Sequence, residues 1–165
     1  MTRRKNFFRN VNWAKLCGAL ALCLGAGGIG SIFTTPAIPT WYAGLNKPEF
    51  SPPNFMFAPV WTTLFILMAV ALYLIWQKGW QNKTARTGMI IFIIHLFFNT
   101  LWSILFFTFH SPFLALLDII ILWLLIIILI IKFYALDKRA GCLLIPYFLW
   151  VSFASVLNYF IFILN

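Results

Sequence analysis

The chain has 165 residues, of which 63% are hydrophobic, 19% aromatic and 9% charged. Soluble domains carry about 25% charged residues, so this composition indicates an integral membrane protein and excludes an ordinary soluble domain. The net charge of +9 would suggest a nucleic-acid partner in a soluble protein. In a membrane protein, basic residues at helix ends set the topology and contact lipid headgroups, so we expect the bilayer as partner and no nucleic acid.

Five apolar segments are each long enough to cross a hydrocarbon core, which needs about 20 helical residues. They predict an all-α membrane protein with one domain, a bundle of five transmembrane helices. The first segment also has the basic start of a signal peptide, but its apolar run continues further, which favours a retained span. The predicted helices cover residues 16–38, 57–76, 88–109, 113–134 and 142–164, with a proline-rich loop at 39–56.

The basic residues predict the orientation. Of the 12 Lys and Arg residues, all except Lys47 fall on one side of the predicted bundle. The positive-inside rule then places the N-terminus in the cytoplasm, and the C-terminus and the 39–56 loop outside. The composition favours a bacterial cell membrane. The basic residues on the cytoplasmic side are Arg3, Arg4, Lys5, Arg9, Lys15, Lys78, Lys83, Arg86, Lys132, Lys138 and Arg139.

The stretch from Trp41 to Trp61, WYAGLNKPEFSPPNFMFAPVW, is unusual for a loop between two spans. Proline fixes φ and biases the preceding residue toward extended geometry, so Lys47-Pro48 and Pro52-Pro53 predict a stiff, extended segment. A stiff aromatic loop above a helical bundle is typical of a lid over a binding site.

Polar and aromatic residues recur at helical spacing inside three predicted spans, and each set occupies one helix face. Faces of this kind predict an internal cavity lined by rings with a few hydrogen-bonding groups, which suits a flat apolar ligand. The sets are Trp61, Leu64, Phe65 and Met68 in the second span; His95, Asn99, Trp102, Ser103 and Phe106 in the third; and Tyr147, Trp150, Ala154 and Asn158 in the fifth.

Several of these residues also fit a purely structural role. Asn99 and Asn158 suit interhelical hydrogen bonds as well as ligand contacts. His95 fits a packing partner, an axial ligand or a group that titrates near neutral pH. Asp118 fits either a neutral side chain or one paired with a polar neighbour. The sequence has no catalytic triad, paired carboxylates, phosphate loop or metal motif, so we expect no metal site and no required cofactor.

The three cysteines lie in or beside apolar segments without CxxC spacing. They are interpreted as small buried hydrophobic residues rather than disulfide partners or metal ligands. The cysteines are Cys17, Cys23 and Cys142.

The loop motif W-Y-x-x-L-x-K-P-x-x-x-P-P-x-x-x-F-x-P-V-W-T, running from Trp41 to Thr62, closely resembles the translocator protein / tryptophan-rich sensory protein (TspO/MBR) family. The third span, H-L-F-F-N-T-L-W-S-I-L-F-F, and the fifth, L-L-x-P-Y-x-x-W-V-S-F-A-x-x-L-N, are similar to the family's corresponding helices. The likeness covers nearly everything from Trp41 to Asn165.

The resemblance implies a five-helix bundle, commonly a homodimer, that binds porphyrins, sterols and benzodiazepine-type ligands under the first loop. Some bacterial family members are reported to degrade protoporphyrin in light, and Trp61 and Trp150 match the tryptophans implicated there. His95 occupies a position where the family usually has Gln, which adds a titratable, metal-capable ring. The implied ligand-binding residues are Tyr42, Pro52, Trp61, His95, Asn99, Trp102, Trp150 and Ala154.

The C-terminal helix departs from the family's sterol motif. Leu157 and Tyr159 are present, but no basic residue follows them, so tight cholesterol binding is not expected. Three hypotheses result: a receptor or transporter-like protein for porphyrins and other tetrapyrroles, haem-type ones included; an enzyme that photo-oxidises protoporphyrin through Trp61 and Trp150; and a structural or partner-binding membrane protein.

Overall fold

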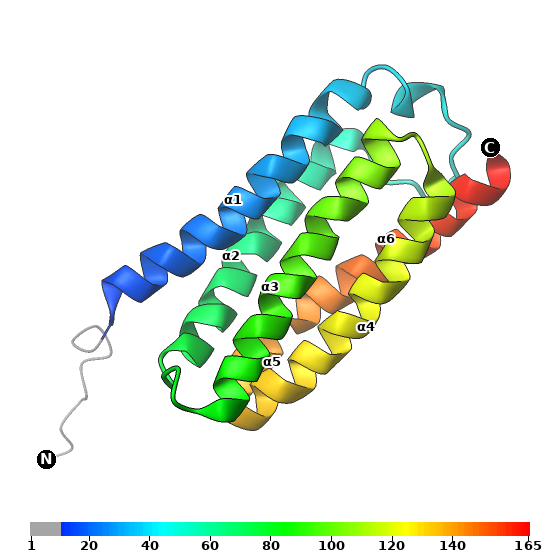
Figure 1. Ribbon diagram of the computed structural model, residues 1–165. Coiled ribbons are helices and arrows are strands. Elements are labelled where there is room, and N and C mark those ends of the chain that lie inside the picture. Colours follow the sequence, from blue (N-terminus) through cyan, green and yellow to red (C-terminus); the bar gives the residue numbers. More distant parts are fainter. Residues whose placement is uncertain (1–10) are drawn as a thin grey trace, which may run out of the picture.

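The computed structural model describes residues 11–165. Within that range the chain forms helices and no strands, and five helical spans are long and apolar enough to cross a membrane (Figure 1). The predicted all-α, five-span fold is therefore confirmed. The helices are α1 (Trp13–Ala37), α2 (Phe57–Trp76), α3 (Lys83–Ser103), α4 (Pro112–Leu136), α5 (Lys138–Leu143) and α6 (Ile145–Leu164), with a π-helix at Ile104–Thr108 and 3-10 turns at Tyr42–Gly44 and Asn54–Met56.

Side-chain caps fix where four of the helices begin. A short polar residue before each first turn accepts a hydrogen bond from a backbone N–H that has no partner inside the helix. Pro112 follows its cap at the first helical position, where a missing N–H costs nothing. The capping pairs are Asn12 with Lys15, Asn82 with Ala85, Ser111 with Leu114, and Asp137 with Arg139.

The helix ends differ from the predicted ones by one to three residues in the first and fourth helices, and by more in two places. The third helix begins at Lys83 rather than residue 88, because Asn82 caps it, and its last turn is the π-helix. The predicted connection 135–141 is reduced to Asp137, because α5 begins at Lys138. The helix then breaks at Leu144, and Pro146 lies in the first turn of α6. The second helix, Phe57–Trp76, matches its predicted range.

The helices pack as neighbours along one bundle. α1 lies against α2 and α3, α4 lies against α3 and α6, and α5 packs on α2 and α4. The proline-rich loop and the C-terminal end of α6 lie at one end of the bundle (Figure 1), which we call the loop end. The α2–α3 connection and the α4–α5 turn lie at the other, which we call the basic end.

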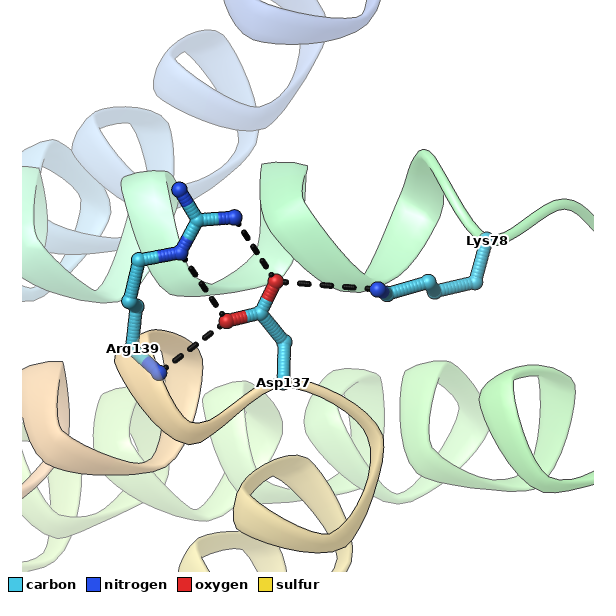
Figure 2. A network of polar contacts seen from close by, with 3 residues as sticks. All are labelled: Lys78, Asp137 and Arg139. Carbon is cyan, nitrogen blue, oxygen red and sulfur yellow. Dashed lines mark hydrogen bonds and ion pairs between the residues drawn. The ribbon is translucent and has the colours of Figure 1, made fainter.

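At the basic end, the Asp137 carboxylate contacts the side chains of Lys78 and Arg139 (Figure 2). Asp137 accepts two hydrogen bonds from the Arg139 guanidinium, at 3.1 and 3.0 Å, and lies 3.6 Å from the ammonium of Lys78. These contacts lower the pKa of the Asp137 carboxyl from 3.8 to about 2, chiefly through the Arg139 hydrogen bonds. The contact with Lys78 links the α4–α5 turn to the end of α2.

The predicted burial of the cysteines is correct only for Cys23. Cys17 and Cys142 are exposed on the outer faces of α1 and α5, because the apolar segments that hold them turn these positions away from the bundle. Of the basic residues used for the orientation, Arg3, Arg4, Lys5 and Arg9 lie outside the described residues.

Candidate ligand-binding site

A cavity of about 430 Å³ lies among α1, α2, α3 and α6 in the half of the bundle nearest the proline-rich loop. Cavities that hold small ligands have volumes of about 300–1,000 Å³. The lining residues are Leu24, Ala26, Gly27, Gly28, Gly30, Ser31, Thr34 and Thr35 from α1; Ile38, Tyr42 and Asn54 from the segment between α1 and α2; Phe57, Ala58, Trp61, Thr62 and Phe65 from α2; Asn99, Trp102, Ser103, Phe106 and Phe107 from α3 and the π-helix; and Trp150, Ala154, Leu157, Asn158 and Ile161 from α6.

Aromatic rings supply much of the cavity wall. Trp102 and Phe106 stack with ring centroids 5.1 Å apart and planes at 20°, and Trp61 faces Phe65 at 5.7 Å. The π-helix turns both Phe106 and Phe107 inward, where they also contact the ring of Tyr42. A π-helix widens the turn by one residue and is often found at functional sites. The wall therefore offers several ring faces and edges to a flat ligand.

Two indole N–H groups at the cavity behave differently. The Nε1–H of Trp102 donates to Asn158 Oδ1 at 3.0 Å, and Asn158 Nδ2 donates to the Pro112 carbonyl at 2.8 Å. Asn158 thus joins α3, α4 and α6 as well as lining the cavity. The Nε1–H of Trp150 is buried and has no acceptor among residues 11–165. A buried donor without a partner is costly, and a ligand acceptor would satisfy it.

His95 and Asn99 meet at one hydroxyl group. Tyr147 Oη lies 3.0 Å from His95 Nε2 and accepts a 2.9 Å hydrogen bond from Asn99 Nδ2. His95 Nδ1 lies 3.0 Å from the Phe92 carbonyl oxygen. His95 and Tyr147 are fully buried, whereas Asn99 lines the cavity. The described structure therefore favours the packing role for His95, one layer behind the cavity wall.

The proline-rich loop covers the cavity and is fastened at several points. Asn46 N donates to Asn165 Oδ1 at 2.9 Å, and Asn165 Nδ2 donates back to the Asn46 carbonyl at 3.0 Å. The Lys47 ammonium donates to the Tyr42 carbonyl at 2.6 Å and lies 4.6 Å from the centre of the Tyr42 ring. Burial raises the pKa of the Tyr42 phenol, so this cavity residue stays neutral.

Further aromatic contacts hold the two flanks of the loop. Trp41 stacks on His110 with centroids 4.5 Å apart and planes at 21°. Phe50 contacts Phe160 edge to face at 5.4 Å. The loop is therefore bound both to the α3–α4 connection and to α6, as expected for a lid with a defined closed position.

The structure brings six of the eight predicted site residues to the cavity. They are Tyr42, Trp61, Asn99, Trp102, Trp150 and Ala154. His95 and Pro52 are not among the lining residues. Pro52 is half-buried in the loop, where the Pro52-Pro53 pair shapes the backbone. Leu64, Met68 and Tyr147 share faces with lining residues but are buried in the helix core.

The α1 wall was missed by the sequence interpretation. Glycines in a membrane span often permit close helix contact. That role fits Gly27, where an added Cβ would lie 2.5 Å from the Phe65 ring. Both glycines line the cavity, but Gly28 has nothing within 4 Å of such a Cβ. The small residues from Gly25 to Ser31, followed by Thr34 and Thr35, were the available signal for an open wall.

Asp118 lies on α4, outside the cavity lining, and only 4% of its surface is exposed. Neither carboxyl oxygen has a hydrogen-bond partner among the described residues. The sequence allowed either a neutral Asp118 or one paired with a polar neighbour, and no such pairing is seen among the described residues.

Comparisons with known proteins show the family of the chain. The TspO/MBR family model matches residues 19–164. The tryptophan-rich protein TspO of Archaeoglobus fulgidus is 42% identical over 155 residues, covering 94% of this chain and 99% of that protein. The protein of the same name from Chlorobaculum tepidum is 42% identical over 146 residues, covering 88% and 92%. The human translocator protein is 32% identical over 149 residues, covering 89% and 88%. With a family match over most of the chain and the aromatic loop above a five-span bundle, this membrane protein belongs to the TspO/MBR family.

Proposed function

We propose that this protein is a membrane receptor that binds porphyrins and similar flat, apolar ligands inside its helix bundle. The observation that carries the proposal is the cavity of about 430 Å³ beneath the proline-rich loop, with Trp61, Trp102 and Trp150 in its wall. Flat ligands gain affinity from stacking on aromatic rings and from the apolar area that they bury. The Trp150 N–H, which has no acceptor among residues 11–165, offers a hydrogen bond to a ligand carboxylate or carbonyl.

The rim of the cavity supports entry of an apolar ligand. Leu24, Gly28 and Ser31 of α1 line the cavity and are exposed, and Ala58 and Thr62 do the same on α2. The cavity is therefore bounded on one side by residues at the surface of the bundle, in the membrane-spanning part of the chain. A hydrophobic ligand reaches such a rim from the bilayer without crossing water.

The test is a titration of purified protein with protoporphyrin, followed by quenching of tryptophan fluorescence. Removal of a large buried aromatic contact in Trp150→Ala or Trp61→Ala should weaken binding by roughly 1–3 kcal/mol. Trp80→Ala is the matched control, because Trp80 is 54% exposed and lies outside the cavity lining. Wild-type affinity in both cavity variants would place the porphyrin elsewhere.

A second candidate function is light-dependent degradation of protoporphyrin. The observation that favours it is that Trp61 and Trp150, the two residues that match the tryptophans implicated in this reaction, both line the cavity. Illumination of the complex separates the two functions. If the protein is a receptor, the absorption spectrum of the bound porphyrin should stay unchanged under light. If it is an enzyme, the porphyrin should bleach, and Trp61→Phe and Trp150→Phe should slow the bleaching.

We also propose that the protein is a homodimer in a bacterial cell membrane, with the N-terminus in the cytoplasm and the loop end outside. The described basic residues other than Lys47 belong to the basic end, which supports this orientation. Labelling of single cysteines placed at Lys47 and Lys83 tests it, since labels on the same side would contradict the orientation. Crosslinking in native membranes tests the dimer.

A further inference from the structure

We infer that His95 is a positioning residue that fixes which polar atom Asn99 presents to the cavity. Acting through Tyr147, it holds the Asn99 amide so that a hydrogen-bond acceptor faces the ligand. The inference rests on the proposed ligand-binding function and deepens it, because it names the ligand class: flat apolar molecules with an N–H or O–H donor at the point that meets Asn99.

The argument begins at the backbone of α3. A carbonyl oxygen only accepts hydrogen bonds, so the 3.0 Å contact between His95 Nδ1 and the Phe92 carbonyl requires a proton on Nδ1. In the neutral imidazole the other nitrogen, Nε2, is then an acceptor. Since Nε2 lies 3.0 Å from Tyr147 Oη, the phenol must donate its single proton to His95.

The same logic passes through Tyr147 to Asn99. Once its proton points to His95, the Tyr147 oxygen is left as an acceptor, and the group 2.9 Å away that donates to it is Asn99 Nδ2. The orientation of an asparagine amide is fixed by the partners of its two ends. Here the amide nitrogen is directed to Tyr147, which is fully buried, by a chain that ends at a backbone carbonyl.

The carbonyl oxygen of Asn99 remains available. It takes part in no hydrogen bond of the described residues, and it is not among their fully buried unpartnered atoms. Because Asn99 belongs to the cavity lining, Oδ1 is the polar atom that it offers to a ligand. Trp150 offers a donor in the same cavity. A ligand that satisfies both residues therefore carries a donor where it meets Asn99 and an acceptor where it meets Trp150.

Removal of the imidazole should reverse this polarity. In His95→Leu the Tyr147 proton loses its acceptor, and a buried hydroxyl seeks another one. The Asn99 amide already contacts this hydroxyl, and an amide that turns to accept from Tyr147 presents its NH₂ group to the cavity. The variant should therefore favour ligands with an acceptor over ligands with a donor.

Three flat tricyclic probes test this directly. Carbazole, dibenzofuran and fluorene share one shape and differ at a single bridging position, which is N–H, O or CH₂. The wild type should bind carbazole more tightly than dibenzofuran by roughly fivefold, the scale of one net hydrogen bond. His95→Leu should abolish or reverse that ratio. Tyr159→Phe is the control, because Tyr159 is 48% exposed and lies outside both the cavity lining and this chain of hydrogen bonds, so the variant should keep the wild-type ratio.

The outcomes separate the two proposals. If the wild type binds none of the three probes, the ligand-binding function of the cavity is wrong and the inference falls with it. If the probes bind and the ratio is the same in wild type and His95→Leu, only the inference is overturned.

A spectroscopic measurement covers the case in which His95→Leu fails to fold. Imidazole ¹⁵N shifts in the unmutated protein should show His95 protonated at Nδ1 and unprotonated at Nε2. Tyr147→Phe should move the Nε2 resonance. A proton on Nε2 in the wild type would overturn the inference, since Tyr147 would then have its proton free for Asn99.

Discussion

The two halves of the bundle are built from similar apolar residues and packed in opposite ways. In the half near the basic end, Phe92 and Phe133 stack with centroids 5.9 Å apart, and a Cβ added to Gly88 would lie 3.2 Å from the Phe133 ring. In the half near the loop, the rings stand around a cavity of about 430 Å³, and Gly28 faces open space. Protein interiors are close-packed, so a void of this size is unusual and indicates a role other than stability for this half.

The polar groups follow the same division. The Asp137 carboxylate at the basic end has partners on both oxygens, and its contacts join two connections. Near the loop, the Trp150 N–H has no acceptor among the described residues, and Asn99 offers a free carbonyl to the cavity. The comparison fits a bundle in which one half is packed for stability and the other is open for the proposed ligand, so stability and affinity should respond to different substitutions.

The largest expected effect is on the packed half. In Gly141→Ala the new Cβ would lie 2.6 Å from Tyr134 Cβ and 2.8 Å from the Tyr134 backbone. Backbone cannot move aside as a side-chain tip can, so the free energy of unfolding should fall by about 1–3 kcal/mol. Unfolding in mixed detergent and SDS, followed by far-UV circular dichroism, measures the loss.

Gly28→Ala is the matched control in the hollow half. Nothing lies within 4 Å of its added Cβ. Alanine is favoured over glycine inside a helix by roughly 0.5–1 kcal/mol, so the variant should be as stable as the wild type or slightly more stable. Equal losses in the two variants would show that the two halves are packed alike.

The next effect is on affinity. Ala154 lines the cavity, so Ala154→Leu should take up ligand volume and weaken porphyrin binding by roughly 1–3 kcal/mol, the scale of a methylene change in an apolar pocket. The free energy of unfolding should change less than in Gly141→Ala, because the added atoms enter empty space. A large loss of stability with unchanged affinity would contradict the division between the halves.

The sequence predicted the five spans because each is long and apolar, and it predicted Asn99, Trp102, Trp150 and Ala154 at the cavity because helical periodicity places them on common faces. It did not predict the π-helix, which turns both Phe106 and Phe107 inward, because no local residue pattern signals an extra residue in a turn.

The sequence pattern also did not predict how deeply each side chain lies in the bundle. His95 shares a helix face with Asn99, but periodicity gives only the direction of a side chain and not the layer in which it ends. The α1 wall was missed for a related reason. Glycine fits both a close contact, as at Gly27, and an empty wall, as at Gly28, and the choice depends on the size of residues on α2 and α3.

A smaller effect concerns the lid. Asn165→Ala removes the two hydrogen bonds between the Asn165 side chain and the Asn46 backbone. These bonds are exposed, so their loss should destabilise the closed loop relative to the open loop by only about 1 kcal/mol. The ligand dissociation rate should then rise roughly fivefold. Stopped-flow displacement of bound porphyrin measures this rate. An unchanged rate would show that the loop does not have to open for release.

The smallest effect is at the basic end, where the Asp137 contacts act on stability and not on binding. The folded pKa of about 2 is below the ordinary value of 3.8, so the carboxylate stabilises the fold above about pH 4. That contribution is lost as the pH falls from about 4 to about 2. Because the Arg139 side chain is 64% exposed, solvent screens the pair, and we expect only a small contribution to stability. Asp137→Asn keeps a capping side chain for α5 and removes the charge. It should therefore lower the free energy of unfolding slightly at pH 7, converge with the wild type near pH 2, and leave porphyrin affinity unchanged at both pH values. A change in affinity would show that the two ends of the bundle are coupled.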